Sequence, residues 1–362
     1  MPRTDVTAPR VTRLLVAGVV LALAAVACGS SDGSGSSSGT TQVPLASATL
    51  NGSGATFPKA FYEEAIEAYK TVQPGITVNY AGGGSGKGRQ ELQDGVVDYA
   101  GSDGIVKAED VPKYKGEFLY VPTVAAPITV SYNLTSVPDL TLDGPTIAKI
   151  FQRQIKQWDD PAIKALNGSA SLPKTAITVA HRSDGSGTTE NFTKYLVSAG
   201  GSDWTLKSGS TVEWPADTQA GNGNQGVAQI VKTTSGAIGY VDLADATASG
   251  LQTAAVRNKD GKAVKATVSG ATAALQNVTV NPDGTYNPLD AAGADSYPIT
   301  APTWILVYKN QADKARGDGL KSFLTYLVTD AQEVAGDIDF AKLPSNVQQK
   351  AESQIALIVV PA

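Results

Sequence analysis

From Thr49 onward, β-branched apolar runs alternate with amphipathic runs of helical spacing, and this alternation limits the possible folds more than any other feature. In 55–71, an aromatic or alanine residue recurs at every fourth position, which is the spacing of one face of a helix. The run 76–80 (ITVNY) that follows has the composition of a strand. Strands that alternate with helices predict an α/β fold with mainly parallel sheets.

The same patterns predict the remaining elements and their grouping into lobes. Further strands are expected at 97–101, 121–133, 176–180, 237–241 and 304–308, and further helices at 89–94, 146–155, 188–197, 321–328 and 330–335. A domain averages about 150 residues, so 362 residues predict two lobes. We expect lobe I to comprise 49–125 and 298–362 and lobe II to comprise 126–297, with chain crossings near 123–126 and 297–302.

The first 27 residues have the organisation of an export signal. Three arginines lie near the start, and the uncharged apolar run 14–27 follows them. That run is too short to cross a hydrocarbon core of about 30 Å as a helix. It ends in Ala-Val-Ala, directly before the only cysteine of the chain, Cys28. We therefore expect 1–27 to be a signal peptide and Cys28 a lipid attachment point, with an incidental cysteine after an ordinary cleavage site as the alternative.

The stretch after Cys28 and the composition set further limits on function. The Ser/Gly-rich segment 29–48 predicts a flexible tether, so 28–48 would join a lipid anchor to a folded domain. Without residues 1–27, 26 basic and 33 acidic residues remain, a net charge of −7 that argues against general nucleic-acid binding. One cysteine and one histidine exclude an intrachain disulfide framework and a metal site built from several such ligands.

Three glycine-rich turns lead into predicted helices, at 51–57, 82–88 and 181–188. The second and third follow predicted strands. Each offers backbone N–H groups and hydroxyls at the positive end of a helix dipole, which is how a protein without excess positive charge binds a small oxyanion. Such turns are also ordinary strand-to-helix connections with Ser or Thr caps. Three of them in one chain, one carrying Arg182, favour anion binding.

Two better-known motifs fail on these turns. The turn 82–88 lacks the glycine six residues before Lys87 and the hydroxyl residue after it that a phosphate-binding NTPase loop needs. Neither Ser85 nor Ser186 has both flanking glycines of a hydrolase nucleophile. We expect His181 to be a partly exposed strand-end residue and not a catalytic base.

Two aspartates lie close to the turns. Asp103 follows the strand-like run 97–101, and Asp184 lies two residues from Arg182. Either can serve as a turn or cap carboxylate, and Asp184 can also hold the guanidinium. The sharper hypothesis is that Asp103 faces the anion, because a carboxylate repels an oxyanion unless that anion still carries a proton to donate.

Three motifs resemble those of one family, the periplasmic or lipid-anchored phosphate-binding protein of the bacterial phosphate ABC importer. They are GSGATFP at 52–58, VNY at 78–80 with VDYAGSD at 97–103, and HRSDGSGT at 181–188. Supporting stretches are KQWDD at 156–160, GSTVEWP at 209–215 and GAIGYV at 236–241. The resemblance covers nearly all of 49–362 in order.

This resemblance implies a two-lobed periplasmic-binding-protein fold of type II, with a hinge between the lobes and a ligand cleft at helix N-termini. It implies a site in which hydroxyls, backbone N–H groups, one guanidinium and one proton-accepting carboxylate bind inorganic phosphate. The residues carried over are Thr56, Phe57, Ser85, Asp103, Arg182, Ser186, Gly187 and Thr188, with Asp184 holding Arg182. It further implies a monomer, lipid-anchored on the outer face of the cell membrane, that delivers phosphate to a transmembrane permease without a cofactor, a metal or catalysis.

Other functions stay open from the residues alone. A phosphatase would use the same cradle but needs metal ligands or an activated nucleophile. A receptor for sulfate or molybdate would have the same architecture, although those anions bring no proton for Asp103. A surface adhesin fits the tether but leaves the three turns unexplained. Lys87 and Arg89 depart from the family's second motif and would make the entrance to the site more basic.

Overall fold

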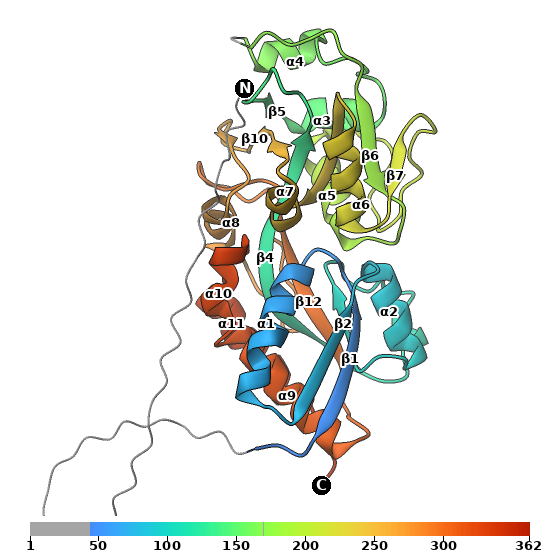
Figure 1. Cartoon of the computed structure of the whole chain (residues 1–362), viewed down its shortest axis with the longest axis vertical. Helices are drawn as coiled ribbons and strands as arrows, with labels where there is room; N and C mark the ends of the chain where they lie inside the picture. The colour runs from blue at the N-terminus through green and yellow to red at the C-terminus, as the bar shows by residue number, and fades with distance from the viewer. Residues whose placement is uncertain (1–43, 169) are drawn as a thin grey trace, which may run out of the picture. The chain divides into compact units, whose positions relative to one another are not determined.

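The computed structural model describes residues 44–168 and 170–362, and within them a mixed sheet of nine strands forms the centre of the fold (Figure 1). Its strand order is β2-β1-β3-β12-β4-β8-β6-β7, and β9 also pairs with β4. These strands are β1 (Ala48–Gly54), β2 (Ile76–Ala81), β3 (Tyr99–Ser102), β4 (Phe118–Tyr132), β6 (Thr178–Arg182), β7 (Gln219–Gly221), β8 (Ala237–Asp242), β9 (Gln252–Thr253) and β12 (Thr300–Tyr308). The predicted signal peptide, Cys28 and most of the predicted tether lie outside the described residues.

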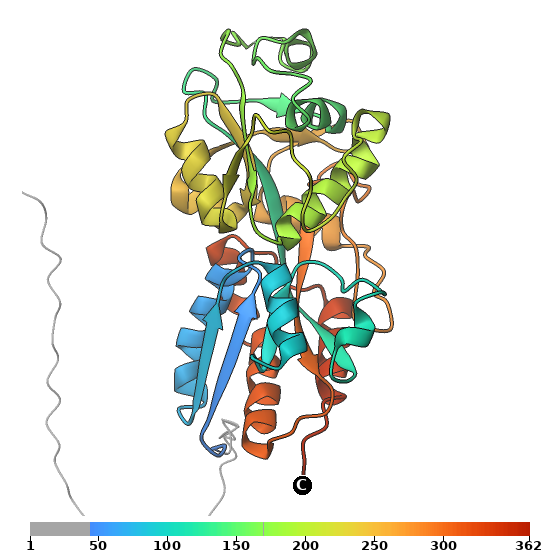
Figure 2. The ribbon, with the colours of Figure 1, turned by 90° about the vertical axis from the view of Figure 1, so that its right-hand side faces the viewer.

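Helices pack around the strands, and the amphipathic runs of the sequence predict several of them. They are α1 (Lys59–Val72), α2 (Ser85–Asp94), α3 (Gly144–Phe151), α4 (Pro161–Leu166), α5 (Gly187–Ala199), α6 (Gly223–Thr233), α7 (Leu243–Ser249), α8 (Val268–Leu275), α9 (Lys314–Val328), α10 (Gln332–Ala335) and α11 (Ser345–Ala356). α1 begins later than predicted, because Gly54 has a positive φ of 136° and Pro58 directly precedes the first helical residue. α1 and α2 lie on opposite sides of β1 and β2 (Figures 1 and 2).

The pairing is parallel at both ends of the sheet and antiparallel in its middle. β1 pairs in parallel with β2 and β3, and β6 pairs in parallel with β7 and β8. β12 lies between β3 and β4, antiparallel to both, and β4 is antiparallel to β8. The expectation of mainly parallel sheets is therefore wrong in the middle of the sheet. Parallel neighbours need crossover connections, and α1, α2, α5 and α6 supply them for the outer strands.

β4 and β12 connect the two groups of parallel strands. β4 is 15 residues long, and its residues 118–127 pair with all of β12, with a register change between Thr303 and Trp304. The predicted chain crossings fall in or beside this strand pair. A separate three-stranded sheet, β11 (Ala263–Val264), β10 (Ala255–Arg257) and β5 (Thr141–Leu142), lies apart from the nine-stranded sheet.

Apolar packing accounts for the placement of the helices. A large cluster of buried apolar side chains extends through most of the described chain. A smaller cluster packs Val227 and Val231 of α6 against Ala180 of β6 and Val241 of β8. In the part of the chain that the structure describes, no helix has both the length and the apolar character needed to cross a membrane.

Candidate functional site

The candidate site lies at the carboxyl ends of the parallel strands, where four turns lead into helices. β1 leads into α1, β2 into α2, β6 into α5 and β7 into α6. These turns are in direct contact, since the N–H of Gly187 donates to Ser85 Oγ at 3.2 Å and the N–H of Asn224 donates to Thr56 Oγ1 at 3.3 Å. Helix N-termini carry unpaired N–H groups and a partial positive charge, so their convergence favours an anion.

Ser85, Asp103 and Gly187 form one buried cluster. Ser85 Oγ accepts the N–H groups of Asp103 and Gly187, both at 3.2 Å, and donates to Asp103 Oδ2 at 3.3 Å. Thr303 Oγ1 donates to the other carboxylate oxygen, Asp103 Oδ1, at 2.7 Å. A Cβ atom at position 187 would lie 2.5 Å from Ser85 Oγ and 2.7 Å from Asp103 Cβ. This close approach therefore requires glycine at the first residue of α5.

The carboxyl group of Asp103 is nearly inaccessible, because the residue is only 2% exposed. Burial raises the pKa of Asp103 from 3.8 to about 7, although the Thr303 hydrogen bond, the Arg182 charge and the Ser85 hydrogen bond all favour its ionised form. A carboxylate in this position can accept a hydrogen bond from a protonated anion. It would face an unprotonated anion oxygen without a donor between the two.

Arg182 is the buried cation of the site, and its guanidinium is held on two sides. Nε donates to Asp184 Oδ1 at 2.8 Å, and Nη2 donates to Asp184 Oδ2. On the other side, Nη1 donates to Asn224 Oδ1 at 2.6 Å. Burial alone would raise the pKa of Asp184, but the hydrogen bonds and charge of Arg182 lower it overall. The structure thus brings Arg182 and Asp184 together as a forked ion pair.

Two hydroxyl residues stand at the start of α5 beside Gly187. Ser186 Oγ caps the helix by accepting the N–H of Thr189 at 3.0 Å. Thr188 Oγ1 is buried and has no hydrogen-bond partner among the described residues. A buried polar group without a partner costs about 1–3 kcal/mol, so the Thr188 hydroxyl gains when a ligand supplies that partner.

Thr56 and Phe57 precede α1 and differ in what they can offer. Thr56 is partly exposed, and its hydroxyl contacts the first turn of α6. The ring of Phe57 is buried edge-on against Phe340, with the ring centroids 6.3 Å apart. The Phe57 side chain belongs to the core, which leaves its backbone as the part that can face a ligand.

Three polar residues complete the site and are missing from the sequence prediction. Asn224 binds Arg182, Thr303 binds Asp103, and Asn191 Nδ2 donates to the carbonyl of Asp103 at 2.6 Å. A signal for Asn224 was present, because the Gly-rich turn 221–224 follows a strand and opens a helix like the other three turns. Thr303 and Asn191 lie inside a strand and a helix, where no local pattern marks them.

Lys87 and Arg89 are each offset by a carboxylate, so the entrance gains little positive charge from them. Lys87 Nζ lies 3.6 Å from a carboxylate oxygen of Glu91. Arg89 Nη1 lies 3.8 Å from Glu190 and donates to Ser102 Oγ at 2.9 Å. Arg89 thereby braces the turn that leads to Asp103.

His181 is buried and not partly exposed as the sequence predicts. Its ring stacks on Trp214 with the centroids 5.0 Å apart, and its Nδ1–H donates to the carbonyl of Arg182 at 2.9 Å. Burial lowers the pKa of His181. Trp214 comes from a long loop, and its indole covers the ring that a strand-end position would otherwise expose.

Residues 44–168 and 170–362 contain no group of three or more His, Cys, Asp or Glu side chains placed to hold a metal ion.

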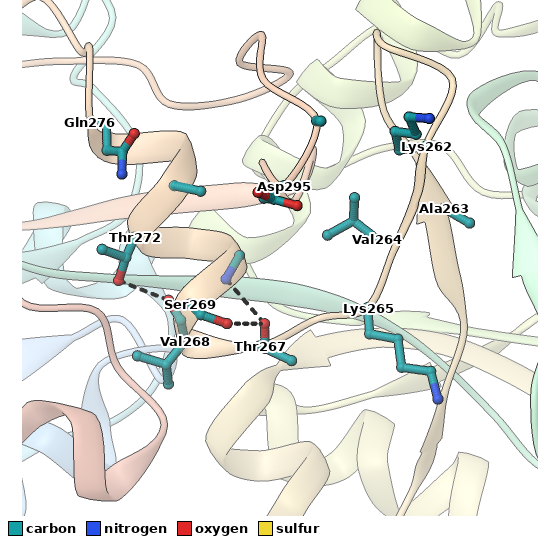
Figure 3. Close-up of a pocket in the computed structure, with 13 residues that line it drawn as sticks. Lys262, Ala263, Val264, Lys265, Thr267, Val268, Ser269, Thr272, Gln276 and Asp295 are labelled. Carbon is teal, nitrogen blue, oxygen red and sulfur yellow. Dashed lines mark hydrogen bonds between the residues drawn. The ribbon is translucent and has the colours of Figure 1, made fainter.

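Of two cavities described here, one reaches the candidate site and the other lies apart from it. A cavity of about 160 Å³ reaches Asp103 and is also lined by Asn191, Tyr286 and Trp304. A groove of about 1040 Å³ lies elsewhere, along α8 and the Lys262–Lys265 segment, as Figure 3 shows. None of the predicted site residues lines that groove, so it is separate from the converging turns.

Comparison with known proteins gives the class of the protein. Residues 35–331 match the PBP superfamily domain. A periplasmic phosphate-binding protein (PfluDING), solved with bound phosphate, superposes with a TM-score of 0.71 at 22% identity and covers 84% of this chain and 93% of its own. A human phosphate-binding apolipoprotein superposes with a TM-score of 0.69 at 21% identity, with coverage of 84% and 93%. The fold and the converging turns define a protein of the periplasmic-binding-protein superfamily.

Sequence relatives narrow this class to one family. The phosphate-binding protein PstS of Methanocaldococcus jannaschii is 35% identical over 344 residues, which are 88% of each chain. The phosphate-binding protein PstS 3 of Mycobacterium tuberculosis is 32% identical over 357 residues, 93% of this chain and 95% of that protein. The chain belongs to the PstS family of phosphate-binding proteins.

Proposed function

We propose that this chain binds inorganic phosphate outside the cytoplasm and delivers it to the membrane permease of an ABC importer. The observation that carries the proposal is that a buried guanidinium, Arg182, and a buried carboxyl, Asp103, both lie at the converging helix N-termini. The guanidinium supplies charge for an anion, and the carboxylate supplies an acceptor for that anion's proton. Membership of the PstS family supports the same ligand.

The proposed ligand set surrounds the anion with donors from both groups of strands. Hydroxyls or backbone N–H groups come from the start of α1, α2 and α5, and the guanidinium comes from the end of β6. The proposed phosphate ligands are Thr56, Phe57, Ser85, Asp103, Arg182, Ser186, Gly187 and Thr188, with Asp184 in support. Charge-assisted hydrogen bonds of this kind contribute about 1.5–3 kcal/mol each when water is excluded.

Selectivity follows, above the pKa of about 7 at which the buried Asp103 ionises, from the proton that phosphate still carries and sulfate lacks. Phosphate donates that proton to Asp103 and leaves no polar group of the site unpaired. Sulfate brings no donor, so the carboxylate faces an anion oxygen directly. Sites built around one ligand hydrogen bond reject analogues that lack it by about 10⁴–10⁵-fold. Asp103 is therefore the proposed selectivity residue.

We further propose two lobes, 49–125 with 298–362 and 126–297, joined where β4 pairs with β12. Ligand residues come from both proposed lobes, since Ser85 and Asp103 belong to the first and Arg182 and Thr188 to the second. A hinge at the β4–β12 pair would let the two sets separate when phosphate enters or leaves. The hydrogen bond between Gly187 and Ser85 supports a closed arrangement in which the sets meet.

The proposed location is the outer face of the cell membrane. Residues 1–27 would be removed as a signal peptide, and lipid on Cys28 would anchor a monomer through the 28–48 tether. The test is metabolic labelling with a fatty acid of the wild type and of Cys28→Ser. Label in the wild type alone supports the anchor, and equal labelling of both contradicts it.

Equilibrium dialysis with labelled phosphate tests the binding function directly. We expect saturable uptake of one phosphate per chain, and release by arsenate, which carries a proton as phosphate does. Turnover of a chromogenic phosphate ester tests the phosphatase alternative and is expected to be absent. Ester hydrolysis without phosphate retention would contradict the proposal.

A further inference from the structure

A buried chain of hydrogen bonds, here called the relay, leads from Arg182 through Asn224 to Asp242. Arg182 Nη1 donates to Asn224 Oδ1 at 2.6 Å, and Asn224 Nδ2 donates to Asp242 Oδ2 at 2.5 Å. The other oxygen of Asp242, Oδ1, accepts the N–H of Asp245 at 2.9 Å and so caps α7. Asn224 has no exposed surface and Asp242 is 1% exposed. Each member of the relay therefore has a fixed partner on both sides.

Asn224 also touches the other side of the site. Its backbone N–H donates to Thr56 Oγ1 at 3.3 Å, while its side chain holds the guanidinium of Arg182. One residue at the start of α6 thus contacts two of the proposed phosphate ligands, Arg182 at the end of β6 and Thr56 in the turn between β1 and α1.

An amide, and not a carboxylate, contacts Nη1 of Arg182, and this matters because Arg182 already has one carboxylate partner. Asp184 forms a forked ion pair with Arg182 and offsets its unit charge. A second carboxylate in contact with Nη1 would give this cluster a net negative charge beside an anion. The amide of Asn224 holds Nη1 in the same geometry without adding charge. The carboxyl group of Asp242 binds that amide and does not contact the guanidinium.

We propose that Asn224 is a positioning residue that aims Arg182 and Thr56 at the phosphate while keeping a second negative charge out of contact with the guanidinium. This inference rests on the proposed phosphate function. Asp242 orients the Asn224 amide, so that its oxygen faces Arg182 and its NH₂ group faces away.

An exchange of the two side chains separates geometry from charge. In the double variant Asn224→Asp with Asp242→Asn, the introduced aspartate accepts from Arg182 and the introduced asparagine donates to that aspartate. The amide oxygen of the asparagine still accepts the N–H of Asp245, and Asn is as good a helix cap as Asp. The hydrogen bonds that join positions 182, 224 and 242 and the cap of α7 are kept, whereas the contact of position 242 with the Asp245 side chain changes and the carboxyl group moves into contact with Arg182. Gln229→Glu is the matched control, because this exposed residue adds a charge on the same helix, beyond its first turn.

The experiment measures phosphate dissociation constants by calorimetry and melting temperatures for the wild type, Asn224→Asp, the double variant and Gln229→Glu. We expect Asn224→Asp to melt well below the wild type and the double variant to recover most of that loss. We expect the double variant to bind phosphate at least tenfold more weakly, and Gln229→Glu to stay within threefold of the wild type. Recovery of stability without recovery of affinity is the result that a purely structural role for Asn224 does not produce.

Other outcomes overturn specific parts of the account. Wild-type affinity in a folded double variant overturns the inference while leaving the phosphate function intact. If the double variant does not fold, Asn224→Ala decides, since it frees Nη1 without adding charge. A loss of at least fivefold in Asn224→Ala affinity supports positioning, and wild-type affinity overturns it. Absence of phosphate binding in the wild type overturns the proposed function itself.

Discussion

Asp103→Asn is expected to change how the stability of the ligand-free protein depends on pH. Burial raises the pKa of Asp103 from 3.8 to about 7, so the folded state holds this proton more tightly than the unfolded state. The stabilisation is complete below the unfolded pKa and is lost as the pH rises through the folded pKa. A difference of about three pKa units corresponds to about 4 kcal/mol, at about 1.36 kcal/mol per unit.

The comparison is the free energy of unfolding of the wild type minus that of Asp103→Asn. This difference should fall by up to about 4 kcal/mol between about pH 4 and pH 7 and then stay constant at higher pH. Asparagine does not titrate, and effects of the other carboxyl groups cancel in the difference. Urea denaturation in phosphate-free buffer measures it, because bound phosphate would add its own stabilisation. Exposed Asp295→Asn serves as the control for the loss of one carboxylate. A difference that stays flat across this range, or rises with pH, refutes the reasoning.

The other predictions concern ligand binding and local packing. Asp103→Asn should lower the ratio of phosphate to sulfate affinity by at least about 100-fold, because an amide can donate to either anion. Calorimetry with both anions measures this ratio, and an unchanged ratio contradicts the role of Asp103. Arg182→Ala should weaken phosphate binding at least tenfold, and wild-type affinity in a folded variant would reject this site. Gly187→Ala places a Cβ 2.5 Å from Ser85 Oγ, so this variant should lose phosphate affinity. Gly168→Ala is the control, because its Cβ meets nothing within 4 Å. Equal phosphate affinities of the two variants would show that the approach of α5 to Ser85 is unimportant.

The sequence predicts the outer parts of the fold better than its middle. The strand and helix periodicities locate β2, α1, β6 and α5 to within a few residues, because each buries one amphipathic or apolar face. They do not reveal that β12 inserts antiparallel between β3 and β4. Local periodicity carries no information on which distant strands pair, so this arrangement depends on tertiary packing.

The site shows the same division between local and distant signals. Ser85, Arg182 and Gly187 stand out because they lie in glycine-rich turns that open helices, and Asp103 stands out because it follows a strand-like run. The structure brings these residues together. Thr303 reaches Asp103 from 200 positions away in sequence, and no turn or cap marks it beforehand.

The most direct test of the central claim is calorimetric titration of the wild-type protein, freed of bound phosphate, with phosphate and with sulfate in the same buffer at about pH 8.5, where Asp103, with a pKa of about 7, is ionised and phosphate still carries one proton. The account predicts stoichiometric phosphate binding and sulfate binding weaker by about 10⁴-fold or more, because Asp103 accepts a proton that only phosphate supplies. Sulfate affinity within about tenfold of phosphate affinity, a difference of only about 1.4 kcal/mol, would contradict it.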